Sequence, residues 1–360
     1  MVRNCLIISA ASTLLWGCGG GGETSPSVPS VPVPPAVSIQ DFSQIGAELN
    51  RLDADNAALI IGNADGELFR MSKGTITPET PLNIASASKL YTGLGIWSLV
   101  EAGDLDQLAK PQDHIEGWTT DAEDARATIT LEHLLSFRSG FNSPPISTSC
   151  SGVISIPLDT CVQSLFNRGL ASVPGEAFAY GPDHMQIAAL MTRGASGQEL
   201  SEVLRQNIWN PAGASAETGF PTDNDNSRYS GAMRSTGEDY GKVLTAFMNG
   251  NLITDRAGFT ADRTGDLLGD VDINALEDLS LDWHYGYGFW IECNTVPFEN
   301  SCNENPRISS PGAFGFLPWA DLEFGYWAVL AMEESIFRDP ARLAIEFQQN
   351  LLPLIEAQFD

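Results

Sequence analysis

The chain has 360 residues, of which 46 are acidic and 19 are basic, and its formal net charge is −27. Apolar residues make up 43% and charged residues 18%, which is typical of a globular protein rather than of a disordered or collagen-like chain. The acidic balance argues against a nucleic-acid partner, because phosphate binding requires clustered lysine and arginine side chains.

The first 17 residues resemble the export signal of a bacterial lipoprotein. Arg3 precedes an apolar stretch, residues 6–15, which is too short to cross a bilayer. The stretch is followed by Trp-Gly-Cys, and the resemblance implies cleavage before Cys18 and lipid attachment to that residue. The alternative is a plain secretion signal with a chance cysteine. We expect an exported protein of the bacterial cell envelope, held by Cys18 in the outer membrane and facing the periplasm.

Residues 18–38 form a predicted linker between this anchor and the folded domain. They are dominated by glycine, proline, serine and valine, a composition that cannot build a core. The folded domain is expected over residues 39–360, with a mostly helical lobe at roughly residues 104–280.

Four cysteines lie in the predicted domain and form two close pairs. Cys150 and Cys161 are 11 residues apart, and Cys293 and Cys302 are 9 residues apart. In an oxidising compartment, the simplest of the three possible pairings gives the disulfides Cys150–Cys161 and Cys293–Cys302. The chain has neither a CxxC pair nor HExxH spacing, so we predict no metal ion and no other cofactor.

The first part of the domain predicts a helix, a hairpin and a second, buried helix. The predicted segments are a helix over residues 41–52, strands over 57–62 and 67–71, and a helix over 82–100. Asp41 is a plausible cap for the first helix, and Gly103 is a stop signal for the second. Only Lys89 interrupts the apolar character of residues 82–100, and a helix that is apolar on most sides is a buried one.

The rest of the domain predicts helices first and then strands. Helical patterns cover residues 131–137, 185–193, 199–208 and 237–248, strand patterns cover 287–292 and 324–332, and a final helix follows Asp339-Pro340. This order predicts an α+β fold. An antiparallel sheet from both chain ends would be flanked by helices, with a mostly helical lobe inserted between its strands.

Ser86 and Lys89 are the candidate chemical pair. They are three residues apart, so they share one face at the start of the predicted buried helix. A desolvated lysine can remove the proton from a serine, which is otherwise a poor nucleophile. Ser88 is a competing candidate, but it should point elsewhere. The alternative for the pair is a capping serine and a snorkelling lysine.

Several motifs resemble the serine β-lactamase-like superfamily, in particular its class C β-lactamase, esterase and penicillin-binding-protein members. Besides Ser86-Ala87-Ser88-Lys89, they are LEHLLSFRSG at residues 131–140, PGEAFAY at 174–180, GAMRSTGEDY at 231–240, GYGFW at 286–290 and SPGAFG at 310–315. The matches follow the order of the family and span about residues 40–358. The resemblance implies the β-lactamase/transpeptidase-like fold.

The resemblance also implies roles for individual residues. Ser86 would be the acylated nucleophile, and Lys89 would help to activate it. Tyr180 would shuttle the proton, with its pKa lowered by the charge of Lys89. The oxyanion hole would consist of the backbone N–H groups of Ser86 and Ala313. The alternative for Tyr180 is an ordinary core tyrosine.

Two departures from the family motifs fall among the residues expected to bind substrate, which are Pro182, Ser310 and Gly312. Pro182 stands where the family has an asparagine, and Asp183 or His184 is a possible replacement for that amide. Ser310 stands where the family has a lysine or histidine, so the cation that would attract a substrate carboxylate is missing. β-Lactams and D-Ala peptides carry this carboxylate, so an uncharged ester or amide fits the sequence better.

We therefore expect a serine hydrolase that acts through an acyl-enzyme on a small-molecule ester or amide. A β-lactamase or D-alanyl peptidase is one alternative, and a catalytically inactive lipoprotein that binds the cell wall is another. Aromatic residues near the motifs would either line an acyl pocket or, for most of them, belong to the core: Trp283, Trp290, Phe314, Phe316 and Trp319.

Overall fold

The structure is a computed structural model, and it describes residues 40–359 apart from residues 143–148, 154, 223–225, 269–275 and 277. The predicted signal, Cys18 and the predicted linker lie outside the described residues, so they stay predictions. Asp41–Asp360 form one compact unit. Within the described residues, none of the helices has both the length and the apolar character that crossing a membrane would require.

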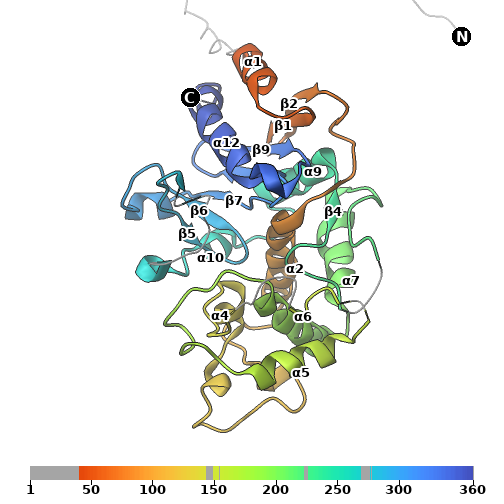
Figure 1. Ribbon diagram of the computed structural model, residues 1–360, viewed down its shortest axis with the longest axis vertical. Helices are drawn as coiled ribbons and strands as arrows, with labels where there is room; N and C mark the ends of the chain where they lie inside the picture. The colour runs from red at the N-terminus through yellow and green to blue at the C-terminus, as the bar shows by residue number, and fades with distance from the viewer. Residues whose placement is uncertain are drawn as a thin grey trace, which may run out of the picture. The chain divides into compact units, whose positions relative to one another are not determined.

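Within the described residues, seven strands form one antiparallel sheet in the order β2-β1-β9-β8-β7-β6-β5 (Figure 1). The strands are β1 Ala57–Asn63, β2 Gly66–Lys73, β5 His284–Tyr285, β6 Trp290–Glu292, β7 Arg307–Ser309, β8 Leu317–Asp321 and β9 Tyr326–Ala331. Because β1 pairs with both β2 and β9, the sheet is built from both ends of the chain. The predicted α+β fold is therefore confirmed.

A second, much smaller sheet joins two distant parts of the chain. It consists of β3 Leu82–Asn83 and β4 Arg234–Ser235, and Asn83 pairs with Arg234. This short pairing fixes the chain directly before Ser86 against the segment that leads into α9.

The helices are numbered along the chain with short turns between them. They are α1 Ser43–Arg51, α2 Ser88–Ala102, α3 Pro111–His114, α4 Leu131–Leu135, α5 Leu158–Arg168, α6 Asp183–Ser196, α7 Leu200–Leu204, α8 Asn210–Ala212, α9 Gly237–Met248, α10 Arg256–Thr260 and α12 Pro340–Glu356. Shorter helical turns are η1 Ala85–Ala87, η2 Ala125–Thr128, η3 Arg205–Trp209, η4 Gly265–Leu268, η5 Asn300–Asn303 and η6 Ile336–Arg338.

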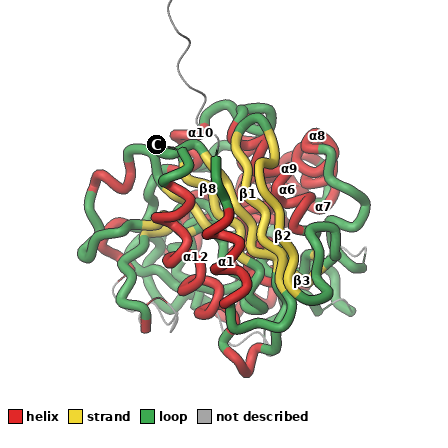
Figure 2. The backbone as a smooth tube through the Cα atoms, turned by 90° about the horizontal axis from the view of Figure 1, so that it is seen from above, coloured by secondary structure: helices red, strands yellow, loops and turns green. Residues whose placement is uncertain are grey.

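The two faces of the large sheet are covered by different helices. Helices α1 and α12 contact each other, and they lie in front of the sheet in Figure 2, whereas α9 lies behind it against β1 and β9. With both faces covered, β1 is buried along all but its last residue. This explains why residues 57–62 are a continuous apolar run rather than an alternating one.

The helical insertion packs around α6. Helices α3, α4 and α5 all contact α6, and α2 contacts α7 (Figure 1). Helix α2 is apolar on most sides and buried along most of its length, as predicted from its sequence. Both predicted disulfides are present, with Cα–Cα distances of 5.3 Å for Cys150–Cys161 and 5.5 Å for Cys293–Cys302.

Several predicted boundaries were wrong, and each error has a local cause. The buried helix begins at Ser88 rather than at residue 82, because Leu82–Asn83 pairs as β3 and Ala85 turns the chain with a φ of 44°. The helix predicted to continue through residue 208 changes to a π-helical turn after Leu204. Asp339 precedes α12 but makes no capping hydrogen bond with its side chain. Strands β7 and β8 and helix α5 were not predicted.

Candidate active site

Ser86 lies in the helical turn η1, directly before α2, and its side chain is partly exposed. Two other segments hold this turn. The Tyr240 hydroxyl of α9 donates to the Ala87 carbonyl at 2.7 Å, and the Ser310 hydroxyl beyond β7 donates to the Ser86 carbonyl at 3.0 Å. Ala85 has positive φ, a conformation that costs a non-glycine residue about 1–3 kcal/mol. The surrounding contacts therefore impose a strained turn that presents Ser86.

Ser88, the competing nucleophile candidate, has its side chain turned away from Lys89. Its hydroxyl donates to the Ala85 carbonyl at 2.7 Å and accepts the N–H of Met233 at 3.2 Å. The residue is completely buried. Ser88 thus stabilises the turn, while Ser86 remains accessible.

Lys89 is buried beside Ser86 with only 4% of its surface exposed. Its Nζ donates to Ser86 Oγ at 2.8 Å and to the carbonyl of Ser230 at 2.8 Å. No carboxylate among the described residues pairs with it. Burial, assisted by the positive charge of Arg228, lowers the pKa of Lys89 to about 7. A substantial fraction of this lysine is therefore an uncharged amine at neutral pH, able to accept a proton.

Tyr180 completes the group, and its ring lies 4.7 Å from Lys89 Nζ. The ring stacks on Trp290 with centroids 5.7 Å apart, and Phe137 and Tyr285 pack against it edge-on. Phe137 also has positive φ, at 57°. The sequence therefore predicted correctly that Ser86, Lys89 and Tyr180 come together.

The expected effect of Lys89 on Tyr180 was wrong. Burial raises the pKa of Tyr180 to about 12, although a hydrogen bond with the Ser86 side chain opposes this rise. The expectation assumed a fully charged lysine, but Lys89 has a pKa of about 7 and carries only part of that charge near neutral pH. In the resting state Tyr180 is therefore a protonated phenol, suited to donate or relay a proton.

The predicted oxyanion site adjoins Ser86 through the chain beyond β7. A Cβ at Gly312 would lie 2.3 Å from the Ile84 carbonyl, so only glycine allows this close approach. Ala313 follows and is exposed. Among the described residues, neither the Ser86 N–H nor the Ala313 N–H has a backbone acceptor. The arrangement is compatible with an oxyanion hole, and the assignment of these two donors stays a prediction.

The two residues suggested as replacements for the missing amide are occupied elsewhere. Pro182 precedes α6 and is buried. The Asp183 carboxylate accepts from the Ser149 hydroxyl at 2.6 Å and from Arg168 Nη2 at 2.7 Å. His184 is fully buried. Neither side chain therefore replaces the missing amide beside Lys89.

The His184 ring has its own fixed partners. One ring nitrogen contacts the Ser139 hydroxyl at 2.8 Å, and the other contacts the Ala179 carbonyl at 2.8 Å. Burial lowers the pKa of His184 to about 4, so the ring is neutral. Its role is to fix the chain next to Tyr180.

The segment from Asn226 to Gly231 supplies contacts that the sequence did not reveal. The carbonyl of Ser230 binds Lys89, and the carbonyl of Tyr229 accepts from Thr92 Oγ1 at 2.8 Å. Both contacts tie the segment to α2. Every residue has a carbonyl, so no sequence signal identifies Ser230. The neighbouring motif that begins at Gly231 is the nearest indication of this segment.

Most of the aromatic residues near the motifs belong to the core. Trp283, Trp290, Phe316 and Trp319 are each at most 4% exposed, whereas Phe314 is partly exposed. Phe178 and Tyr180, whose rings lie 6.5 Å apart, are also partly exposed.

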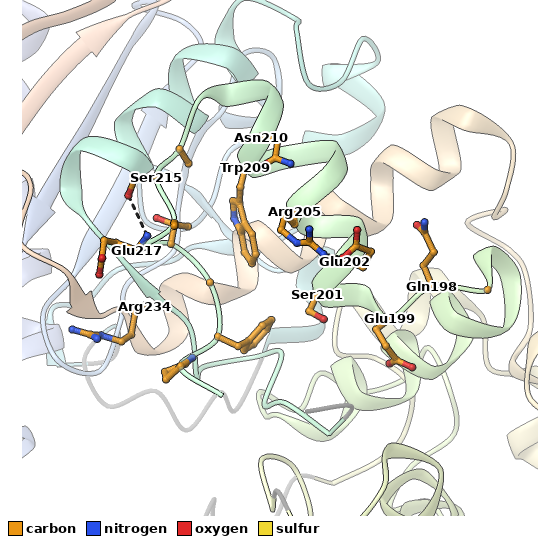
Figure 3. A pocket seen from close by; sticks show the side chains of 17 residues that line it. Gln198, Glu199, Ser201, Glu202, Arg205, Trp209, Asn210, Ser215, Glu217 and Arg234 are labelled. Carbon is orange, nitrogen blue, oxygen red and sulfur yellow. Dashed lines mark hydrogen bonds and ion pairs between the residues drawn. The ribbon is translucent and has the colours of Figure 1, made fainter. Parts of the chain in front are cut away.

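A separate cavity of about 930 Å³ lies between α7 and the chain from Ala214 to Pro221 (Figure 3). Trp209, Arg205 and Arg234 are among the residues that line it. None of Ser86, Lys89 and Tyr180 lines this cavity. Within the described residues, no group of three or more histidine, cysteine, aspartate or glutamate side chains is placed to hold a metal ion.

The model of the β-lactamase family matches residues 48–331. The chain belongs to the β-lactamase family. Members of this family are serine hydrolases that act on small-molecule acyl substrates. A curated relative, protein flp of Staphylococcus aureus strain MRSA252, is 25% identical over 153 residues, which is 42% of this chain. The match spans only 30% of the length of that relative.

Several solved structures have a fold similar to that of this β-lactamase-family chain. A putative β-lactamase from Bacteroides dorei is 22% identical, with a TM-score of 0.70 over 88% of this chain and 100% of that one. EstCE1, a hydrolase with promiscuous acyltransferase activity, is 15% identical, with a TM-score of 0.67 over 86% of this chain and 96% of that one. At these identities the likeness concerns the fold alone.

Proposed function

We propose that this β-lactamase-family chain is an esterase in which Ser86 forms an acyl-enzyme. The observation that carries the proposal is the 2.8 Å contact between Lys89 Nζ and Ser86 Oγ, made by a buried lysine that has no carboxylate partner among the described residues. Lys89, with a pKa of about 7, is a base matched to neutral pH.

In the proposed first step, Ser86 Oγ attacks the ester carbonyl carbon while its proton passes to Lys89 Nζ. The negative charge on the carbonyl oxygen would be stabilised by the N–H groups of Ser86 and Ala313. The bond to the leaving oxygen then breaks. That oxygen takes a proton from the Tyr180 hydroxyl, which regains one from Lys89, and the acyl group remains on Ser86. Water releases the acyl group when the same proton transfers run in reverse.

The substrate-binding positions favour an ester without the carboxylate of a β-lactam. Ser310 uses its hydroxyl to hold the Ser86 carbonyl and offers no cation, and Pro182 has no amide side chain. EstCE1, which has a similar fold, is a hydrolase with acyltransferase activity. This likeness concerns the fold alone, so the preference for an ester rests on Ser310 and Pro182.

The test uses the purified full chain with p-nitrophenyl acetate, p-nitrophenyl butyrate, nitrocefin and a fluorophosphonate probe. We expect ester turnover that exceeds nitrocefin turnover, and labelling of Ser86 identified by peptide mass spectrometry. Ser86→Ala should abolish both turnover and labelling, while Ser88→Ala should keep the label. Nitrocefin as the better substrate would favour a β-lactamase. A folded protein without any label would favour the inactive binding lipoprotein.

We also propose that the chain is exported and held in the outer membrane through a lipid on Cys18, facing the periplasm. The apolar stretch that ends at this cysteine and the Gly/Pro/Ser-rich residues after it support this proposal. Growth of an expressing bacterium with an alkyne fatty acid should label the protein. Cys18→Ser should remove the label and release the protein from the membrane fraction, and equal labelling of both proteins would refute lipid attachment.

A further inference from the structure

Arg228 is a half-buried arginine that has no carboxylate partner among the described residues. Its Nε and Nη2 donate to the carbonyl of Ser151 at 3.2 Å and 3.1 Å. Its side chain packs on Gly152, where an added Cβ would lie 3.0 Å from Arg228 Cβ and 3.2 Å from Nε. The guanidinium is therefore fixed along one edge.

Several other half-buried arginines of this acidic chain are neutralised, whereas Arg234 and Arg256, like Arg228, donate to backbone carbonyls and pair with no carboxylate among the described residues. Arg126 pairs with Asp124, and both Arg138 and Arg263 pair with Glu132. The chain carries 46 acidic residues, so carboxylates are abundant. Among the residues that the structure describes, the Arg228 guanidinium is held only by a backbone carbonyl, so no described carboxylate compensates its charge, and its remaining N–H donors can bind an anion.

This charge lies beside the candidate active site. Ser230, two residues after Arg228, binds Lys89 through its carbonyl. Between Arg228 and η1 lies Gly231, where an added Cβ would be 3.8 Å from Arg228 Cδ and 3.7 Å from the carbonyl carbon of Ala85. Ala85 directly precedes Ser86. The electrostatic effect of Arg228 on Lys89 agrees with this proximity.

We infer that Arg228 is a specificity-determining residue that binds a carboxylate group of the substrate, beside the ester bond that Ser86 attacks. This inference rests on the proposed esterase function. A substrate carboxylate would also offset the repulsion between Arg228 and Lys89 as the lysine takes up the serine proton. Arg228, on the segment from Asn226 to Gly231, would thus supply the cation that is missing at Ser310. The preferred substrate is then an ester whose carboxylate lies next to Arg228 and not next to Ser310.

The test compares esters that differ in one carboxylate. On the acyl side, the pair is 4-nitrophenyl hydrogen glutarate and 4-nitrophenyl pentanoate. On the leaving-group side, the pair is 4-carboxyphenyl acetate and phenyl acetate. Rates are measured at pH 9 with the uncatalysed reaction subtracted. At that pH Lys89, with a pKa of about 7, is mostly uncharged in the wild type, and any change in its pKa affects both esters of a pair equally.

In at least one pair, Arg228→Gln should lower kcat/KM for the charged ester about tenfold to a hundredfold, because a hydrogen bond to a charged group is lost. The neutral ester should change by less than threefold, and Arg228→Lys should retain part of the preference. Arg256→Gln is the matched control, since Arg256 is also half-buried and donates to a backbone carbonyl, that of Met248. It should leave both rates unchanged.

Two results would overturn the inference. The first is an unchanged ratio of charged to neutral ester in Arg228→Gln for both pairs. The second is an equal loss for charged and neutral esters, which would make Arg228 a positioning residue for the Ser230 segment. If the wild-type protein neither turns over any ester nor labels at Ser86, the proposed function fails instead, and this result is distinct from both.

Discussion

Two buried cations in this molecule have opposite surroundings. Within the described part of the chain, the Lys89 amine hydrogen-bonds only to uncharged oxygen atoms, those of Ser86 and Ser230. Arg307 in β7 is also buried, with 7% of its surface exposed, but it pairs with three carboxylates. They belong to Glu292 at 2.7 Å, Asp321 at 3.0 Å and Glu356 at 2.9 Å.

The difference distinguishes a cation that stabilises the fold, Arg307, from one that can exchange a proton, Lys89. Coulombic attraction by its carboxylates raises the pKa of Arg307, so it stays charged at every accessible pH and links β6, β7, β8 and α12. Burial without a carboxylate lowers the pKa of Lys89 to about 7. Burial alone therefore does not indicate function, whereas burial without compensation yields a group that exchanges protons near neutral pH.

Removing the uncompensated cation should have the largest effect on activity. For Lys89→Met, we expect kcat/KM for p-nitrophenyl butyrate to fall about 10²–10⁴-fold, because a general base is lost. The midpoint of thermal unfolding should stay the same or rise, because methionine avoids the cost of burying an amine. Steady-state kinetics and calorimetry measure the two effects. Retained activity would exclude Lys89 as the base.

Removing the compensated cation should act on stability instead. Arg307→Met leaves the carboxylates of Glu292 and Asp321 buried without their partner, which should cost about 3–5 kcal/mol of the free energy of unfolding. Below its unfolding temperature, the variant should keep kcat/KM within threefold of the wild type. Denaturant unfolding checks the first statement. A variant as stable as the wild type would show that this cluster is not structural.

The pH dependence of activity should follow Lys89. Because only its uncharged form accepts the serine proton, kcat/KM for a neutral ester should rise about tenfold per pH unit below about pH 7 and level off above it. Stopped assays over pH 5–9 measure this limb. A limb centred above pH 9 would contradict the assignment of Lys89 as a base with a lowered pKa.

The pH dependence of stability provides a second measure of the same group. Lys89 loses its proton near pH 7 in the folded state, and its ordinary value is 10.5. Between these values the unfolded state holds more protons, so the free energy of unfolding should rise with pH in the wild type relative to Lys89→Met. Below pH 7 both states are protonated, and the destabilisation is fully present. Arg307 should add no such slope, because it remains charged.

Removing the two disulfides should have the smallest effects on activity. Each disulfide lies next to one of the two regions compared above. Cys150 lies next to Ser151, which holds Arg228, whereas Cys293 lies next to Glu292, which holds Arg307. Replacing either pair with alanines should cost about 2–3 kcal/mol of stability, because each closes a short loop. Only the Cys150→Ala/Cys161→Ala variant should also lower kcat/KM, by several-fold. Equal kinetics in both variants would show that the first disulfide does not support the active site.

Local patterns were sufficient for much of the fold but not for its boundaries. The hairpin of β1 and β2, the apolar helix α2 and helix α12 follow from runs and periodicities within single segments. The start of α2 was wrong because β3 depends on pairing with β4, about 150 residues away. Strands β7 and β8 are short and lie within a loop-rich sequence, so only their neighbours in the sheet define them.

The sequence by itself determined that Ser86 and Lys89 lie side by side, because residues three positions apart on a helix share a face. It also identified Tyr180 through its motif. The state of these groups was decided only by the tertiary structure. Burial, the nearby charge of Arg228 and the absence of a paired carboxylate lower the pKa of Lys89, and burial raises that of Tyr180. Proton affinity depends on solvent exclusion and on charges brought in from distant segments, and neither quantity is encoded locally.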